Sequence, residues 1–304
     1  MEIEGKITKG LGGIYSVKLE DGSCVNCSVR GLFRKNKITP TIGDDVSLVP
    51  SGDPDVEYVI SRIHPRRSYL IRPPVANVDV LLLCFAVKDP EPDLKLLDKM
   101  LVICALIGIK PVIVFTKADI DPQSASSLRA VYCDAGFDCF VSSPSSPVEP
   151  SALLSLAKPG ATFGLAGPSG VGKSTLCNHL LTDKKMEVGD ISDRLKRGKH
   201  TTRHVELFEF DTGFVMDTPG FTSLSLVELG VEYKSVVSGY PEIALRAKEC
   251  RFDDCRHACE RDCAVLASVG SSIDRGRYDR YHEFEDELYQ LRNTYTGRKK
   301  FGYE

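Results

Sequence analysis

The sequence has no apolar run long enough to cross a membrane, because a membrane-spanning helix needs about 20 apolar residues. Its longest apolar runs, at 80–87 and 100–109, fall well short of that length. The N-terminal residues, Met-Glu-Ile-Glu-Gly, lack the basic start and the apolar centre of a signal peptide. We therefore expect a cytoplasmic protein without a membrane segment.

The sequence also lacks a strong excess of charge. Its formal net charge is −3 at pH 7, so the chain as a whole is not attracted to nucleic acid. Any contact with RNA would need a local basic face. A length of 304 residues exceeds that of the usual single domain, and we expect two or three domains.

A disulfide framework is not expected, although the chain contains eleven cysteines. Eleven is an odd number, and seven of these cysteines are scattered before residue 180. This distribution is typical of a protein in a reducing compartment. Internal repeats and long low-complexity tracts are also absent from the sequence.

Residues 1–68 form the first of three predicted segments. Apolar and polar positions alternate there in short runs, separated by turn signals such as Gly43-Asp44, which predicts a small β-barrel. A group of basic residues in this segment could bind a phosphate backbone or could form a solvated surface, and both alternatives remain open. These residues are Arg30, Arg34, Lys35 and Lys37.

Residues 69–225 and 226–304 form the second and third predicted segments. In 69–225, continuous apolar runs alternate with segments of helical spacing, the first of which Asp93 can cap. This pattern predicts a doubly wound α/β domain with a parallel sheet. Residues 226–304 are helical in pattern and contain a cysteine–histidine cluster, which predicts a helical metal-binding domain.

A complete phosphate-loop motif follows the predicted strand at 161–166 and precedes a predicted helix. Its glycines allow backbone N–H groups to surround phosphates, and the helix adds its positive N-terminal end. We expect Lys173 to reach the β- and γ-phosphates and Ser174 to bind Mg²⁺. The expected phosphate-binding residues are Gly167, Pro168, Ser169, Gly170, Val171, Gly172, Lys173, Ser174 and Thr175.

A second motif, Thr-Lys-Ala-Asp, ends the apolar run at 111–115 and would select the base. The carboxylate of Asp119 can accept hydrogen bonds from the ring N–H and the amine of guanine, a donor pair that adenine lacks. Thr116 occupies a position where asparagine is commoner. A serine pair after the next predicted strand offers a backbone N–H to the guanine oxygen. The expected base-binding residues are Thr116, Lys117, Ala118, Asp119, Ser142 and Ser143.

The stretch Asp-Thr-Pro-Gly that begins at Asp217 supplies further parts of a nucleotide site. We expect Asp217 to hold Mg²⁺ through water and the N–H of Gly220 to contact the γ-phosphate. Either Thr201 or Thr202 could be the Mg²⁺ ligand of a switch loop, with a slight preference for Thr202. The base motif precedes the phosphate loop, whereas it comes last in ordinary GTPases, so the order is circularly permuted. Because all these loops follow the carboxyl ends of parallel strands, one site can form in either order.

The hydrolytic water needs a residue to orient it. Many GTPases place a glutamine directly after Asp-x-x-Gly, but this chain has Phe221 there, whose ring can make no such hydrogen bond. His200 is the nearest suitable candidate by sequence. It could instead be a loop histidine without a catalytic role, or one that contacts a partner. The expected catalytic residues are His200, Lys173 and Asp217.

The cysteine–histidine cluster supplies three thiols and one imidazole within fourteen residues, from Cys250, Cys255, His257 and Cys263. This is the ligand count of a closed tetrahedral zinc site, and four protein ligands leave no open position for water. We therefore expect one structural zinc ion per chain. Cys259 could compete with one of these ligands, and the alternative is a set of buried free cysteines beside a surface histidine.

The permuted motif order, the preceding β-barrel and the trailing cysteine–histidine cluster together resemble the RsgA (YjeQ) family of ribosome-associated GTPases. The resemblance covers essentially the whole chain and implies an N-terminal OB-fold, a circularly permuted GTPase domain and a C-terminal zinc domain. It also implies hydrolysis of GTP to GDP and phosphate, stimulated by the small ribosomal subunit and its rRNA during late maturation. The family's guanine, phosphate and zinc roles carry over to the residues given above, and its water-positioning role points to His200. Ser143, where alanine is usual, and Cys259 depart from the family pattern.

Two other functions remain open from the sequence. One is a permuted GTPase that serves another step of ribosome assembly. The other is a nucleic-acid-binding module that holds a nucleotide only as a structural ligand. In each case we expect a monomer with GTP or GDP bound, with Mg²⁺ accompanying GTP, and no contact with a membrane.

Overall fold

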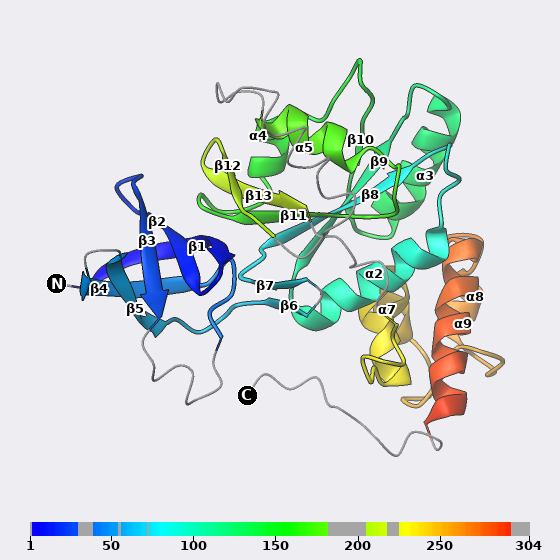
Figure 1. Cartoon of the computed structure of the whole chain (residues 1–304). Coiled ribbons are helices and arrows are strands. Elements are labelled where there is room, and N and C mark those ends of the chain that lie inside the picture. Colours follow the sequence, from blue (N-terminus) through cyan, green and yellow to red (C-terminus); the bar gives the residue numbers. More distant parts are fainter. Residues whose placement is uncertain are drawn as a thin grey trace. The chain divides into compact units, whose positions relative to one another are not determined.

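The computed structural model describes residues 2–29, 39–53, 56–71, 73–181, 205–217 and 225–292 (Figure 1). By its internal contacts the chain divides into two compact units. The first unit comprises Met1–Leu81, Glu149–Ala166 and Lys173–Phe221. The second unit comprises Leu82–Val148, Gly167–Gly172 and Thr222–Glu304.

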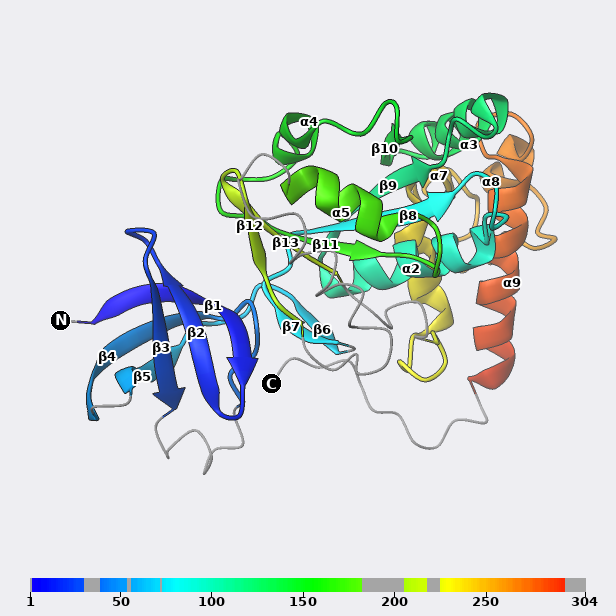
Figure 2. The ribbon, with the colours of Figure 1, turned by 45° about the horizontal axis from the view of Figure 1, so that its top comes forward.

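The N-terminal part of the first unit is a closed barrel with the strand order β1-β2-β3-β5-β4, drawn in blue in Figure 2. Neighbouring strands are antiparallel except β3 and β5, which are parallel. Alternate apolar side chains, including Ile7, Val17, Leu48 and Ile60, point inward and form the barrel core. This OB-like architecture confirms the predicted β-barrel. The strands are β1 (Ile3–Leu11), β2 (Ile14–Leu19), β3 (Cys24–Val29), β4 (Asp45–Asp53) and β5 (Val56–Ile63).

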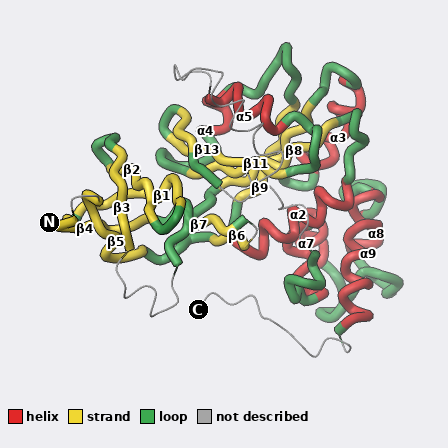
Figure 3. The backbone as a smooth tube through the Cα atoms, in the orientation of Figure 1, coloured by secondary structure: helices red, strands yellow, loops and turns green. Residues whose placement is uncertain are grey.

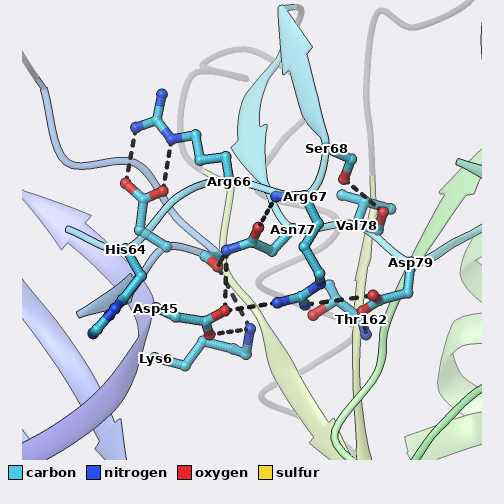
Figure 4. A network of polar contacts seen from close by, with 12 residues as sticks. Lys6, Asp45, His64, Arg66, Arg67, Ser68, Asn77, Val78, Asp79 and Thr162 are labelled. Atoms are coloured by element: carbon cyan, nitrogen blue, oxygen red, sulfur yellow. Dashed lines mark hydrogen bonds and ion pairs between the residues drawn. The ribbon is translucent and has the colours of Figure 1, made fainter. Parts of the chain in front are cut away.

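A polar network joins the barrel to the chain that leads into the central sheet (Figure 4). Arg66 donates hydrogen bonds of 2.7 and 2.9 Å to the two carboxylate oxygens of the fully buried Asp44. Arg67 pairs with Asp45 at 3.0 Å and with Asp79 at 3.4 Å. Asp79 directly precedes β8, so these ion pairs join the barrel strand β4, at Asp45, to the residue before β8. The short hairpin in between consists of β6 (Tyr69–Ile71) and β7 (Pro74–Ala76).

The central sheet has six strands in the order β10-β9-β8-β11-β13-β12. Strand β10 is parallel to β9 and β11 is parallel to β13, whereas the edge strand β12 is antiparallel to β13. Every residue of β8 and of β11 is buried, as expected for strands covered on both faces. The strands are β8 (Val80–Ala86), β9 (Lys110–Thr116), β10 (Asp138–Val141), β11 (Thr162–Ala166), β12 (Phe208–Phe210) and β13 (Gly213–Asp217).

Helices alternate with the parallel strands along the chain, which confirms the predicted α/β architecture (Figure 3). Local signals fix the ends of the first of these helices. The side chain of Asp93 accepts a 2.8 Å hydrogen bond from the N–H of Leu96, and Gly108 ends the helix in the left-handed conformation with φ 70°. The helices are α2 (Leu94–Ile107), α3 (Pro122–Asp134), α4 (Pro150–Leu154) and α5 (Lys173–Leu181).

The C-terminal helices enclose a buried cluster of charges within the second unit. The guanidinium of Arg277, which is fully buried, donates to Asp98 at 2.7 Å and to Glu242 at 2.6 Å. Asp98 also accepts hydrogen bonds from Arg280 at 2.5 Å and from the Tyr132 hydroxyl at 2.8 Å. The cluster joins α2 and α3 to the C-terminal helices, and each buried charge has an opposite charge beside it. These helices are η2 (Tyr233–Gly239), α7 (Pro241–Ala247), α8 (Ala264–Ser268) and α9 (Arg275–Leu291).

In the described part of the chain, no helix combines the length and the apolarity that a bilayer span requires.

Candidate functional site

The base-selecting motif and the phosphate loop are in direct contact within the second unit. Thr116, the last residue of β9, is buried, and its hydroxyl donates a 2.5 Å hydrogen bond to the carbonyl oxygen of Val171. A Cβ added at Gly172 would lie 3.9 Å from the Cβ of Thr116, so the loop backbone packs closely against this side chain. Two motifs that are 55 residues apart in the sequence therefore meet at one place.

The turn after β9 brings the other candidate base-binding residues together. Lys117 adopts the left-handed conformation with φ 54°, and its ammonium donates to the carbonyl oxygen of Asp89. The N–H of Ala118 donates to the carbonyl oxygen of Ser142 at 3.2 Å, while the N–H of Ser142 donates to Phe115 at 2.8 Å. The loop that begins at Ser142 is thus held directly against the Thr-Lys-Ala-Asp turn.

Asp119 is exposed at the end of this turn. Within the described parts of the chain, its carboxylate forms no hydrogen bond or ion pair, so both of its oxygens are available to a ligand. Ser143 is half-buried and forms a short turn with Ser146, in which each residue accepts a hydrogen bond from the backbone N–H of the other. The turn that ends in the exposed carboxylate of Asp119 is thus held against the serine loop.

The phosphate loop requires glycine where it leaves β11. Gly167 has φ 147°, and a Cβ there would lie 2.1 Å from the carbonyl oxygen of Cys84 on β8. Gly170 and Gly172 have φ 78° and 98°, conformations that side chains disfavour. The loop runs directly into α5, which begins at Lys173. A strand, a glycine-rich turn and a helix N-terminus in this order form the backbone geometry that surrounds phosphates.

The remaining nucleotide-site candidates are described only in part. Asp217 is the last residue of β13 and pairs in register with Leu165 of β11, two residues before the phosphate loop. Its backbone therefore lies at the carboxyl end of β13, beside the end of β11 where that loop begins. The structure describes the backbone of Asp217 but not its side chain. Four further predicted residues lie outside the described residues, namely His200, Thr201, Thr202 and Gly220.

The structure brings the cysteine–histidine cluster together. The ligand atoms of Cys250, Cys255, His257 and Cys263 all lie within 4.8 Å of one another. The Sγ atoms of Cys250 and Cys263 are 3.8 Å apart, and the Nδ1 atom of His257 lies 3.6 and 3.5 Å from them. Ligands of a tetrahedral zinc ion with a Zn–S distance of about 2.3 Å are about 3.8 Å apart. These spacings and this donor set fit a tetrahedral metal site, and the exposed Cys259 is not part of it.

Neighbouring groups shape the loop that carries the metal-site candidates. The carboxylate of Glu260 accepts from the N–H groups of Arg256 and Ala258, each at 2.8 Å, and from that of Cys259 at 3.1 Å. Burial opposes ionisation of Glu260, but these hydrogen bonds outweigh it and lower the pKa of the carboxyl to about 2. Burial lowers the pKa of His257, which favours the neutral imidazole that a metal needs.

Sequence reasoning missed the residues that support this loop. Besides Glu260, the Tyr278 hydroxyl of α9 donates a 2.7 Å hydrogen bond to the carbonyl oxygen of His257. The position of Glu260 inside the cysteine–histidine loop could have indicated that its carboxylate accepts hydrogen bonds from backbone N–H groups of the loop. No local pattern indicates that Tyr278, 21 residues farther along the chain, has this role.

Two family profiles match the chain. The profile described as RsgA GTPase matches residues 63–227, and the RsgA N-terminal domain profile matches residues 4–54. Curated relatives agree with them. A protein of Geobacillus sp. (strain WCH70), named small ribosomal subunit biogenesis GTPase RsgA, is 40% identical over 297 residues, which are 96% of this chain and 99% of the relative. A protein of the same name from Clostridium novyi (strain NT) is 41% identical over 293 residues, covering 95% and 98% of the two chains.

Two solved structures share the fold over nearly the full length. YloQ, described as a circularly permuted GTPase, superposes with a TM-score of 0.77 at 33% identity, covering 95% of this chain and 96% of YloQ. YjeQ from Thermotoga maritima superposes with a TM-score of 0.79 at 29% identity, covering 95% and 99% of the two chains. The permuted motif order is therefore a feature of a known architecture.

Proposed function

The chain belongs to the RsgA family of GTPases, and on this premise we propose that it hydrolyses GTP to GDP and phosphate during late maturation of the small ribosomal subunit. The observation that carries this proposal is the hydrogen bond between Thr116 and Val171, which joins a base-selecting turn to a phosphate loop. The ribosomal role rests on the relatives, which are named small ribosomal subunit biogenesis GTPases.

In the proposed complex, Asp119 accepts two hydrogen bonds from guanine, and a backbone N–H of the serine loop at 142–143 meets the guanine oxygen. The stem of Lys117 lies along the base. The phosphates occupy the loop at 167–175, where Lys173 contacts the β- and γ-phosphates. The left-handed turn at Lys117 supports this arrangement, because the turn brings the residues after Thr116 beside the serine loop.

We further propose how this chain's residues assist hydrolysis. Ser174 and either Thr202 or Thr201 would hold Mg²⁺, with Asp217 acting through water. Bound Mg²⁺ would neutralise charge that develops on the phosphates. The N–H of Gly220 would contact the γ-phosphate, and His200 would orient the attacking water, since Phe221 can make no hydrogen bond to it.

The metal cluster is proposed to hold one structural zinc ion. Three thiolates and one imidazole satisfy a tetrahedral ion completely, so no position remains for water or substrate. The zinc would fix the loop at 250–263 against α9, to which the Tyr278 hydroxyl already joins it. The four residues would thus use the ion to stabilise the C-terminal helices, and the ion would take no part in hydrolysis.

The proposed partners are the small ribosomal subunit and its rRNA, and the proposed compartment is therefore the cytoplasm, where the chain would act as a monomer. The OB-like barrel supports the choice of RNA, because this fold commonly binds oligonucleotides. The basic residues predicted to take part, at 30–37, lie outside the described residues.

Co-sedimentation tests the choice of partner. The chain is mixed with purified small or large ribosomal subunits in the presence of a non-hydrolysable GTP analogue, and bound protein is measured after centrifugation. Saturable binding to small subunits, with at most weak binding to large subunits, is expected. Equal binding to both subunits, or preference for the large one, would contradict the proposed function and favour another assembly step.

A further inference from the structure

In the first unit, strand β1 of the barrel contacts the segment that leads into β12. The backbone N–H of Leu207 donates a 2.9 Å hydrogen bond to the carbonyl oxygen of Thr8. Thr8 lies in a β-bulge, because the register of β1 on β2 shifts between Ile7 and Lys9. A bulge interrupts the ladder and redirects backbone groups. The bulge thus provides a hydrogen-bond acceptor for a segment outside the barrel.

Two ion pairs flank this backbone hydrogen bond. Lys9 of β1 pairs with Glu206 at 3.2 Å, and Lys18 of β2 pairs with Glu209 of β12 at 2.6 Å. The Lys18 and Glu209 side chains are only 20% and 32% exposed, and their hydrogen bond raises the pKa of the Lys18 ammonium. A single exposed pair contributes little, but these two act on the same short segment as the backbone bond.

The segment held in this way connects parts of the proposed catalytic site. Glu206 lies four residues after Thr202 in the sequence. Strand β12 is antiparallel to β13, which ends at Asp217. Phe210 of β12 also packs edge-on against Phe163 of β11, with ring centroids 5.4 Å apart, and β11 leads into the phosphate loop. A shift of the barrel strands would therefore act through β12 on β13, the strand that ends at Asp217.

We propose that Lys9 and Lys18 are positioning residues, through which rRNA bound to the barrel sets the position of residues 205–210 for hydrolysis. The inference deepens the proposed function and rests on it, because stimulation requires a partner that contacts the barrel. The two lysines act by holding Glu206 and Glu209, and thereby strand β12, which pairs with the strand that ends at Asp217.

Charge reversal with rescue tests this role. Glu209→Lys places two ammonium groups together, and Lys18→Glu in the same chain restores an opposite pair. At saturating small subunits, the single variant should lose stimulated turnover by about fivefold or more, and the double variant should regain most of it. Basal turnover, GTP affinity and subunit affinity should not change. The matched control is Lys110→Glu, which reverses an exposed pair with Asp138 at 2.9 Å on β9 and β10 of the second unit.

Retention of wild-type stimulated turnover by Glu209→Lys would overturn the inference, as would failure of the double variant to regain it. Hydrogen exchange without subunits gives an independent result. In wild type, amide exchange at 7–9 and 205–210 should differ between GDP and a non-hydrolysable GTP analogue, and the difference at 7–9 should disappear in Glu209→Lys. Identical exchange in the two nucleotides would also overturn the inference. If amide exchange differs between the two nucleotides but subunits do not stimulate turnover of the wild type, the proposed function is wrong. The coupling between residues 7–9 and 205–210 would still be supported.

Discussion

At the scale of single residues, Thr116 makes a structural contact at the position where asparagine is commoner in the proposed base-selecting motif. The Thr116 hydroxyl donates to the Val171 carbonyl oxygen, which is the link that the site needs between turn and phosphate loop. Threonine at the end of a β-strand is also favoured by its branched side chain. The residue thus suits both the strand and the contact with the phosphate loop, and the proposed base selection rests on Asp119.

Asp119→Asn should reduce GTP affinity by about tenfold to a hundredfold, because the variant loses charge-assisted hydrogen bonds to guanine. Affinity for xanthine nucleotide should rise, since xanthine presents an acceptor where guanine has an amine. Nucleotide titration by calorimetry checks both changes. Asp121→Asn is the control, because asparagine can also cap α3, where the Asp121 side chain accepts from the Ser124 N–H at 3.0 Å. Unchanged GTP affinity in Asp119→Asn would refute the assignment.

His200→Ala should retain near-normal binding of GTP and of the small subunit but lose most stimulated turnover. The expected loss is at least about tenfold, because a residue that orients or deprotonates water contributes at least that much. Turnover at saturating subunit concentration, with binding measured separately, checks this. If turnover falls only in step with subunit binding, His200 is a contact residue and another group positions the water.

At the scale of structural elements, local sequence signals were sufficient to predict individual strands, helices and loops. The contacts between residues far apart in the sequence could not be predicted from them. The apolar run at 80–87, the Asp93 cap and the glycine motif predicted β8, α2 and the phosphate loop, because each depends on neighbouring residues. Arg277 and Asp98 form a buried pair across 179 residues, and neither has a local pattern that identifies its partner. The hydrogen bond between Thr8 in the bulge and Leu207 could not be predicted either, because no local sequence pattern identifies the two partners.

Arg277→Met should destabilise the C-terminal helices against α2 by roughly 3–5 kcal/mol, because Glu242 would lose its buried counterion and Asp98 would lose one of its two arginine partners. Chemical denaturation of purified protein measures this change. Arg275→Met, on the exposed side of the same helix, should change stability by less than about 0.5 kcal/mol. Equal stability of the two variants would show that the buried cluster contributes no more than a surface arginine.

The metal loop makes a separate prediction for the C-terminal region. Freshly purified protein should contain one zinc ion per chain. Cys255→Ala should lose this ion, and the unfolding temperature of the C-terminal region should fall. Nucleotide binding should persist in this variant. Cys259→Ala is the control and should retain full zinc content, because Cys259 lies outside the cluster. Elemental analysis and thermal denaturation check this. Absence of zinc from the wild type, or full retention in Cys255→Ala, would contradict it.

At the scale of the whole molecule, a permuted order of motifs leaves the site intact because the contacts depend on the sheet and not on the order of its strands. The parallel pairs β9–β10 and β11–β13 each end in candidate site residues, Thr116 and Asp217 among them. This much was predictable from the motifs. The positions of His200, Thr202 and Gly220 are not described, so their roles remain predictions from the sequence.

We propose that this site hydrolyses GTP in response to the small ribosomal subunit. The most direct measurement is steady-state release of phosphate from GTP by the purified chain, alone and with purified small or large subunits, with Lys173→Ala as the inactive control. We predict slow turnover alone, an increase of at least about tenfold with small subunits, and little change with large subunits. Turnover that small subunits do not raise, or that both subunits raise equally, would contradict the proposed function.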